Sequence, residues 1–156
     1  NIHPGFNPYN KGWYPGVFSI ANGMPAGATI HEIDEKIDNG PIIAQQQIKI
    51  LPEDTSGTVY PKIIQAEYDL LQKWFMPMLT GEYETFLPAE SGNLNYKKDY
   101  YDLQKLDLSE KLTTEEVINK LRALTHPPFK NAYYIDPETG DNIFVSIELY
   151  REKKLE

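Results

Sequence analysis

The sequence begins with an Asn-x-His pair, Asn1 and His3, which runs directly into a loop rich in proline and glycine. In an extended segment residues i and i+2 point to the same side, so the two side chains are expected to face one cavity at a strand end. Open α/β sheets bind their ligands at such places. His3 could take a proton from an attacking group there, and the Asn1 amide could stabilise an oxygen that gains negative charge.

An acidic loop, DEKIDNGP (34–41), follows a predicted strand and offers three carboxylates, Asp34, Glu35 and Asp38. One of them could approach His3, orient its ring and raise its basicity. A solvated turn is the better interpretation for Asp34 and Glu35. Together these groups suit the transfer of an acyl group to an amine. Since no Ser or Cys stands in a recognisable nucleophile elbow, we expect direct transfer without an acyl-enzyme.

The other histidines are predicted to have structural roles. His31 lies within a predicted strand and is interpreted as a packed or surface residue, and His126 precedes two prolines and is interpreted as a loop-positioning residue. A metal site built from Asp and His is the rival hypothesis for the chemistry. Because the sequence has no H-x-x-x-H motif or tight cluster of ligands, we expect no metal.

Composition excludes several classes of partner. The chain has 156 residues and a formal net charge of -8, so its acidity disfavours tRNA or DNA as the main partner. There is no cysteine, which excludes disulfides and thiolate chemistry and agrees with a cytoplasmic location. No apolar run approaches the roughly 20 residues of a membrane-spanning helix, and the N-terminus does not resemble a signal peptide.

Periodicity predicts an α/β layout in the first part of the chain. We expect a short helix within 12–23, strands at 28–34 and 41–50, and a long helix over 51–79. Pro61 should lie in the first turn of the long helix, and Pro77 should kink or end it. Apolar side chains spaced three or four apart predict its core-facing stripe, which consists of Val59, Ile63, Ala66, Leu70 and Trp74.

The character of the sequence changes after residue 80. Residues 81–112 lack clear periodicity and are predicted to form a crossing segment or linker. A T-x-x-E capping box then starts a predicted helix at 114–124, and two β-rich runs around a D-P-E-T-G-D turn predict a hairpin at 132–150. We therefore divide the chain into a core, 1–80, and a small C-terminal subdomain, 81–156, with one helix and one hairpin.

Three separated blocks resemble the catalytic core of the folate-dependent formyltransferases. They are NIHPGFNPYNKGW, GATIHEIDEKIDNGPII and DTSGTVYPKIIQAEYDLL, and they cover about half of the chain. That superfamily has an N-x-H…D constellation with its Asp in a D-x-G-P turn. The resemblance implies that Asn1 holds the formyl oxygen, His3 assists deprotonation of the amine and Asp38 supports His3. It also implies that Ile33, Asp34 and Asp38 border the pterin of N10-formyltetrahydrofolate, the cosubstrate.

The C-terminal half is similar to the sugar N-formyltransferases, through YKKDYYDLQKLDL and INKLRALTHPPFKNAYYIDPETG. Those enzymes act on nucleotide-linked amino-deoxysugars, such as dTDP-4-amino-4,6-dideoxyglucose, that are destined for O-antigen or related glycans. The resemblance implies a Rossmann-like fold, a cytoplasmic enzyme, and a homodimer in which the hairpin takes part. It also suggests that Asn7, Tyr9, Lys11 and Trp13 contact the nucleotide-sugar.

The chain departs from the family pattern because family members have an N-terminal half ahead of the catalytic Asn. We expect that half to have been removed or to reside in another piece. The 156-residue chain alone should then bind formyl-folate poorly and be inactive. Two alternatives stay open: another amine formyltransferase, of the glycinamide ribonucleotide or methionyl-tRNA type, and a non-catalytic dimerisation or nucleotide-sugar-binding fragment. The sugar, the position of its amine and the nucleotide base are not determined by the sequence.

Overall fold

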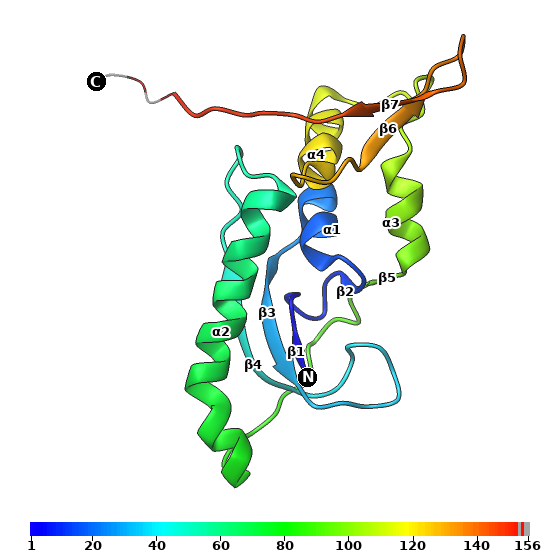
Figure 1. Ribbon diagram of the computed structural model, residues 1–156. Coiled ribbons are helices and arrows are strands. Elements are labelled where there is room, and N and C mark those ends of the chain that lie inside the picture. Colours follow the sequence, from blue (N-terminus) through cyan, green and yellow to red (C-terminus); the bar gives the residue numbers. More distant parts are fainter. Residues whose placement is uncertain (153, 155–156) are drawn as a thin grey trace.

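A three-stranded antiparallel sheet supports the first part of the molecule (Figure 1). The computed structural model describes residues 1–152 and 154. The sheet has the order β1 (Ile2–His3), β3 (Ala26–His31) and β4 (Ile42–Ile48). All six residues of β3, the central strand, are buried. Pairing of Ile2 with Ile30 and of His3 with Thr29 fixes the N-terminal residues against this strand.

The helix α2 (Ser56–Thr80) covers one face of this sheet (Figure 1). Its predicted apolar stripe is confirmed, with Trp74 half-buried at its edge. Burial of these side chains supplies most of the driving force that holds helix and sheet together. The core between them consists of Ala28, Ile30, Ile43, Ala44, Ala66 and Leu70.

The boundaries predicted for the long helix were wrong at its start. It begins at Ser56, so Pro61 lies in the second turn instead of the first. At the other end the helix continues past Pro77 to Thr80, where Gly81 adopts the left-handed conformation and donates its backbone N–H to the Pro77 carbonyl. The strands predicted at 28–34 and 41–50 occur, two to three residues away from some of the predicted ends.

Helices from both parts of the chain share two further clusters of buried side chains. Helix α1 (Pro15–Asn22) packs between α2 and α4 (Thr114–Leu124) through Ile20, Val59, Ile63 and Ala123. Tyr100, Leu124 and Ala132 join α3 (Lys97–Gln104) and α4 to β6 (Ala132–Ile135). Helix α4 contributes to both clusters and therefore ties the C-terminal elements to the core.

The predicted C-terminal helix and hairpin are confirmed, but the linker prediction was wrong. Helix α4 has the predicted limits, and Thr113 and Glu116 form the predicted capping box. The hairpin is shorter than 132–150, with β6 paired to β7 (Asn142–Val145). Within the supposed linker, β5 (Leu94–Asn95) runs parallel to β2 (Lys11–Gly12) and helix α3 follows.

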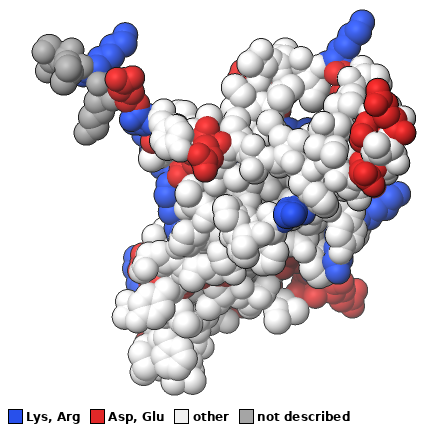
Figure 2. Space-filling model, turned by 45° about the horizontal axis from the view of Figure 1, so that its top comes forward, with Lys and Arg blue, Asp and Glu red and all other residues white. Residues whose placement is uncertain are grey.

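These elements confirm the predicted α/β class, whereas the division at residue 80 stays a prediction. The last residues of the predicted subdomain, 153, 155 and 156, lie outside the described residues. In the part of the chain that the structure describes, no helix combines the length and apolar character that a membrane crossing would need. On the face shown in Figure 2, basic side chains lie singly and do not form a continuous patch.

Candidate functional site

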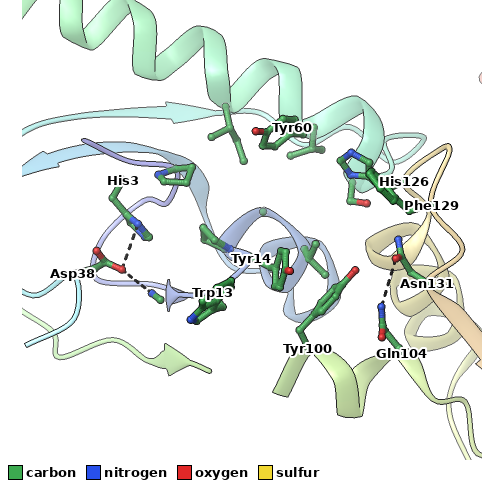
Figure 3. Close-up of a pocket in the computed structure, with 18 of the residues that line it drawn as sticks. His3, Trp13, Tyr14, Asp38, Tyr60, Tyr100, Gln104, His126, Phe129 and Asn131 are labelled. Atoms are coloured by element: carbon green, nitrogen blue, oxygen red, sulfur yellow. Dashed lines mark hydrogen bonds and ion pairs between the residues drawn. The ribbon is translucent and has the colours of Figure 1, made fainter. Parts of the chain in front are cut away.

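Two side chains singled out by the sequence, those of Asn1 and His3, contact the carboxylate of the third, Asp38. Figure 3 shows the contact between His3 and Asp38. Asn1 Nδ2 donates to Asp38 Oδ1 over 3.1 Å. His3 Nδ1 lies 3.4 Å from Asp38 Oδ2. Asn1 immediately precedes β1 and His3 ends it, so the pairing of β1 with β3 sets the position of both. The structure thus brings the N-x-H pair and the D-x-G-P turn together.

The backbone around Asp38 fixes its carboxylate in this position. Asp38 lies in the loop between β3 and β4 with a φ of 46°, a left-handed conformation that Asp tolerates better than most residues. The backbone N–H of Gly12 donates to Asp38 Oδ2 over 3.0 Å, and Asn7 Nδ2 donates to the Asp38 carbonyl over 2.9 Å. With the bond from Asn1, three hydrogen bonds from the first twelve residues of the chain therefore hold this residue.

The ring of His3 is buried, with 4% of the residue exposed. Its Nδ1 faces Asp38, and that contact favours the tautomer with the proton on Nδ1. The other nitrogen, Nε2, has no hydrogen-bond partner among the described residues. A buried nitrogen of this kind carries a free lone pair, which is the form that accepts a proton.

Electrostatics favours a neutral His3 beside an ionised Asp38. Burial lowers the pKa of His3 below its ordinary 6.5, the Asp38 charge opposes this, and the His31 charge reinforces it. For Asp38, burial would raise the pKa, but the contact with His31, the charge of His3 and the hydrogen bond from the Gly12 N–H together bring it below the ordinary value. At neutral pH the pair therefore consists of a base and a carboxylate.

The structural interpretation of His31 overlooked a contact with the same carboxylate. His31 Nε2 lies 3.6 Å from Asp38 Oδ1 and 3.2 Å from Asn1 Nδ2. Its Nδ1 lies 2.7 Å from the Glu32 carbonyl, which requires the Nδ1 proton, so Nε2 accepts from Asn1 when the ring is neutral. The period-2 pattern of β3 could have placed His31 near the strand end, but no sequence signal identifies Gly12.

A cavity of about 690 Å³ opens beside His3 and Asp38. Its size suits a ligand larger than a simple metabolite. Trp13 and Tyr14 line its middle, and His126, expected only to position a loop, also lines it (Figure 3). Most of the remaining lining comes from α1, α2 and α3, together with the loop that follows α4.

The four predicted substrate residues lie in different surroundings. Trp13 lines the cavity, with 47% of the residue exposed. Asn7 is buried beneath Asp38, and Lys11 Nζ donates to Asn39 Oδ1 and to the Ser91 carbonyl. The Tyr9 hydroxyl donates to Glu90 over 3.1 Å. These three are not among the residues that line the cavity, so the structure does not bring them together with Trp13.

The loop predicted to border a pterin presents different side chains to the cavity. Ile33 is 81% exposed, and Asp34 accepts a hydrogen bond from the Lys36 backbone N–H. Neither lines the cavity, whereas Ile37 and Asp38 do. No group of three or more His, Cys, Asp or Glu side chains in the described chain is arranged to hold a metal ion.

The chain matches two protein-family models. Residues 1–74 match the model described as formyl transferase, and residues 99–151 match the N-formyltransferase dimerization C-terminal domain. A relative from Mycobacterium tuberculosis, described as dTDP-4-amino-4,6-dideoxyglucose formyltransferase, is 48% identical over 156 residues, which is 100% of this chain. The chain spans 66% of the length of that relative.

Solved structures agree with these matches. A 4-N formyltransferase from Francisella tularensis superimposes with a TM-score of 0.93 and 45% identity, over 97% of this chain and 62% of that one. An N-formyltransferase from Helicobacter canadensis, in complex with folinic acid and dTDP-3-aminofucose, gives a TM-score of 0.72 and 28% identity over 79% of this chain and 46% of that one. They confirm the predicted Rossmann-like formyltransferase core. With the site geometry and both family matches in agreement, the chain belongs to the formyltransferase family and carries its N-formyltransferase dimerization domain.

Proposed function

We propose that the protein containing this chain is an N-formyltransferase that acts on the amine of a nucleotide-linked amino-deoxysugar. The acceptor class follows the relatives, among them the dTDP-4-amino-4,6-dideoxyglucose formyltransferase. The observation that carries the proposal is the buried Nε2 of His3, which has no hydrogen-bond partner among the described residues, in a side chain that lines a cavity beside Asp38. A neutral base at the wall of a 690 Å³ cavity is suited to a bulky amine.

N10-formyltetrahydrofolate is the proposed cosubstrate and supplies the formyl carbon. The residues present fit a carbonyl group, because Asn1 is exposed and its amide nitrogen, which contacts Asp38 and His31, can donate one of its two protons to a carbonyl oxygen instead. Ile37 and Asp38, which line the cavity, would border that group, and Asn1, which contacts Asp38, is not itself among the lining residues. In keeping with the ligands named for the Helicobacter canadensis structure, a folate and a dTDP-sugar would occupy the site together.

In the proposed reaction, His3 and Asp38 carry out the proton transfers. As the sugar amine forms its bond to the formyl carbon, His3 Nε2 accepts the proton that the amine loses. Asp38 stabilises the resulting imidazolium through His3 Nδ1 and keeps the ring in the required tautomer. Asn1 stabilises the formyl oxygen while it carries negative charge. His3 then returns its proton to the leaving nitrogen as the old C–N bond breaks, so the base is regenerated.

We also propose that the protein acts as a cytoplasmic homodimer. A sequence without cysteine suits a reducing compartment. The match of residues 99–151 to a dimerization domain supports the dimer. So do three exposed apolar side chains on the hairpin, Ile135, Ile143 and Phe144, which a partner subunit could cover.

The test is a formyl-transfer assay with the full-length protein and N10-formyltetrahydrofolate. The acceptors are dTDP-4-amino-4,6-dideoxyglucose, a UDP-amino sugar and glycinamide ribonucleotide, and the products are identified by mass spectrometry. We expect formylation of the dTDP-sugar. Transfer to glycinamide ribonucleotide alone would show that the protein is instead an amine formyltransferase of the glycinamide ribonucleotide type. A folded protein that formylates none of the three acceptors would refute the proposal.

A further inference from the structure

The proposed reaction depends on the orientation of one exposed side chain, the amide of Asn1. A single bond joins this amide to the rest of the side chain. An amide turned the wrong way would present its oxygen, instead of its nitrogen, to a formyl oxygen that gains negative charge. Because Asn1 is exposed, neighbouring side chains restrict it less than they would in the core. Whatever directs its two N–H bonds therefore determines how well the site stabilises the transferred group.

His31 lies directly opposite Asn1 on the neighbouring strand. The His31 backbone N–H donates to the Asn1 carbonyl over 3.0 Å, and the Asn1 backbone nitrogen donates to the His31 carbonyl over 2.9 Å. This exchange continues the antiparallel register between β1 and β3. Residues paired in this way carry their side chains on the same face of the sheet. Strand pairing therefore places the imidazole of His31 beside the Asn1 amide.

The ring proton of His31 lies on the nitrogen that faces away from Asn1. Nδ1 lies 2.7 Å from the Glu32 carbonyl, which can only accept, so this nitrogen carries a proton. In the neutral ring Nε2 then has a free lone pair, and it lies 3.2 Å from Asn1 Nδ2. A ring protonated on both nitrogens would set one donor against another. The neutral ring is therefore the form that fits the observed contact.

Asp38 decides which end of the Asn1 amide faces His31. An ionised carboxylate only accepts hydrogen bonds, so the amide nitrogen, 3.1 Å from Asp38 Oδ1, must face it. That oxygen, His31 Nε2 and Asn1 Nδ2 form a triangle with sides of 3.1, 3.2 and 3.6 Å. Its angle at the amide nitrogen is well below the roughly 120° between the two N–H bonds of an amide. The two acceptors therefore cannot both receive a straight hydrogen bond from separate protons.

A single Asn1 proton can serve both acceptors. An N–H that lies between His31 Nε2 and Asp38 Oδ1 makes a shared, three-centre hydrogen bond of a kind that is common in proteins. The other proton of the amide then points away from both acceptors and is available to a carbonyl oxygen. If Asp38 were the sole acceptor, the amide could swing about that one contact. The second acceptor, His31, is thus what defines the direction of the free N–H.

His31 can influence the reaction only through its neighbours. The residue is 3% exposed and is not among those that line the 690 Å³ cavity, so it does not reach the substrate. Asp38 is also held by the Gly12 N–H and by Asn7. In residues 1–152 and 154, by contrast, the Asn1 side chain has hydrogen bonds to His31 and Asp38 alone. Loss of the His31 acceptor should therefore affect Asn1 most.

We propose that His31 is a positioning residue for formyl transfer, whose neutral Nε2 acts with the Asp38 carboxylate to hold the Asn1 amide with one N–H directed at the formyl oxygen. The inference rests on the proposed function, since it concerns the group that stabilises the transferred carbonyl. It gives a chemical role to a histidine that the sequence pattern alone indicates to be structural.

Two substitutions of His31 in the full-length protein test the proposal by formyl transfer. His31→Phe keeps a planar ring and removes the acceptor, whereas His31→Gln supplies an amide oxygen that can accept from Asn1. We expect kcat to fall about 10²-fold in His31→Phe, the smaller effect of losing an oxyanion donor, with KM unchanged, and to stay within a few-fold in His31→Gln. A folded His31→Phe protein that keeps its rate would overturn the inference, and so would a His31→Gln protein that is equally slow.

A double substitution tests whether His31 acts through Asn1. Asn1→Ala should lower kcat by about 10²-fold or more. Adding His31→Phe to Asn1→Ala should then cost little further, because the group that His31 positions is already absent. Thermal midpoints of the single and double variants show separately whether the fold is retained. If the two losses multiply in folded proteins, His31 acts by another route and the assignment is refuted.

A third measurement needs no turnover. In protein with isotope-labelled histidine, proton–nitrogen correlation spectra at mildly alkaline pH should show a neutral His31 with its proton on Nδ1, assigned by the absence of its signals in His31→Gln. A proton on Nε2 would overturn the inference.

The outcomes separate this inference from the proposed function. The expected His31 spectrum in a folded protein that transfers no formyl group would support the hydrogen-bond arrangement and refute the function. Formylation of an amino sugar at an unchanged rate by His31→Phe would do the reverse. Should His31→Phe fail to fold, the spectrum of the unaltered protein and the rate of His31→Gln still decide.

Discussion

Replacing Asp38 by Asn removes one charge from the site and leaves its size almost unchanged. In the proposed reaction the charge of Asp38 stabilises the imidazolium of His3 across 3.4 Å. At that distance, and with an effective dielectric constant of about 20 for a partly buried pair, the attraction is about 5 kcal/mol. The neutral amide retains part of this through its dipole. We therefore expect kcat to fall about 10³-fold, which corresponds to roughly 4 kcal/mol.

The assay is formyl transfer by the full-length protein, measured from acid to neutral pH. His3 must be neutral to accept a proton, and its pKa is already below 6.5, so kcat/KM of the unaltered protein should decline only below that pH. The charge of Asp38 raises the pKa of His3, so its removal should move this decline to still lower pH. Asp69→Asn, on α2, removes a charge outside the cavity and serves as the control.

Two results would refute this reasoning. The first is an Asp38→Asn protein that is folded and retains its rate to within a few-fold. The second is an acid limb that moves upward in pH, since that would mean the group titrating in the profile is not a histidine whose charge Asp38 stabilises.

Three further substitutions test other features of the structure. A Cβ on Gly5 would overlap His3 Nε2, so Gly5→Ala should displace the ring and lower kcat about 10²-fold, the smaller end of what a positioned base contributes; unchanged turnover would contradict that placement. Arg122→Met should lower the free energy of unfolding by about 3 kcal/mol in urea titrations, because two carbonyls and one side chain lose the donors that the buried guanidinium provides. Thr113→Ala should cost about 1 kcal/mol through loss of the α4 cap, and its neighbour Thr114→Ala, which has no capping role, should cost clearly less.

The sequence predicted best where a physical pattern was local. The capping box identified the start of α4, and the helical spacing identified the buried face of α2. Its failures have physical causes too. Helix α3 was overlooked because Tyr100 is its one buried residue, so the segment shows no apolar periodicity. It becomes helical through packing on α4 and β6, which is information that a single segment does not contain.

The sequence predicted the catalytic side chains of the site but not the backbone groups that hold them in place. Asn1, His3 and Asp38 were identified through residue types and a family pattern, and the structure places them in contact. The contribution of the Gly12 backbone N–H could not be predicted, because every residue but proline has that group and only the fold decides where it points.

The short parallel pairing of β2 with β5 links the site to the stretch of chain that lies between the two family matches. Gly12, whose N–H binds Asp38, is held there because Trp13 donates its backbone N–H to Asn95 and Lys11 donates its own to Asn93. A side chain at residue 12 would collide with the Asn95 carbonyl, so this junction also requires glycine. Residues 93–95 therefore help to hold the Gly12 N–H in place for the Asp38 carboxylate. A change that displaces residues 93–95 would be expected to weaken the hydrogen bond between Gly12 and Asp38. Residues 11–13 and 93–95, although about 80 residues apart in the sequence, therefore position the catalytic carboxylate together.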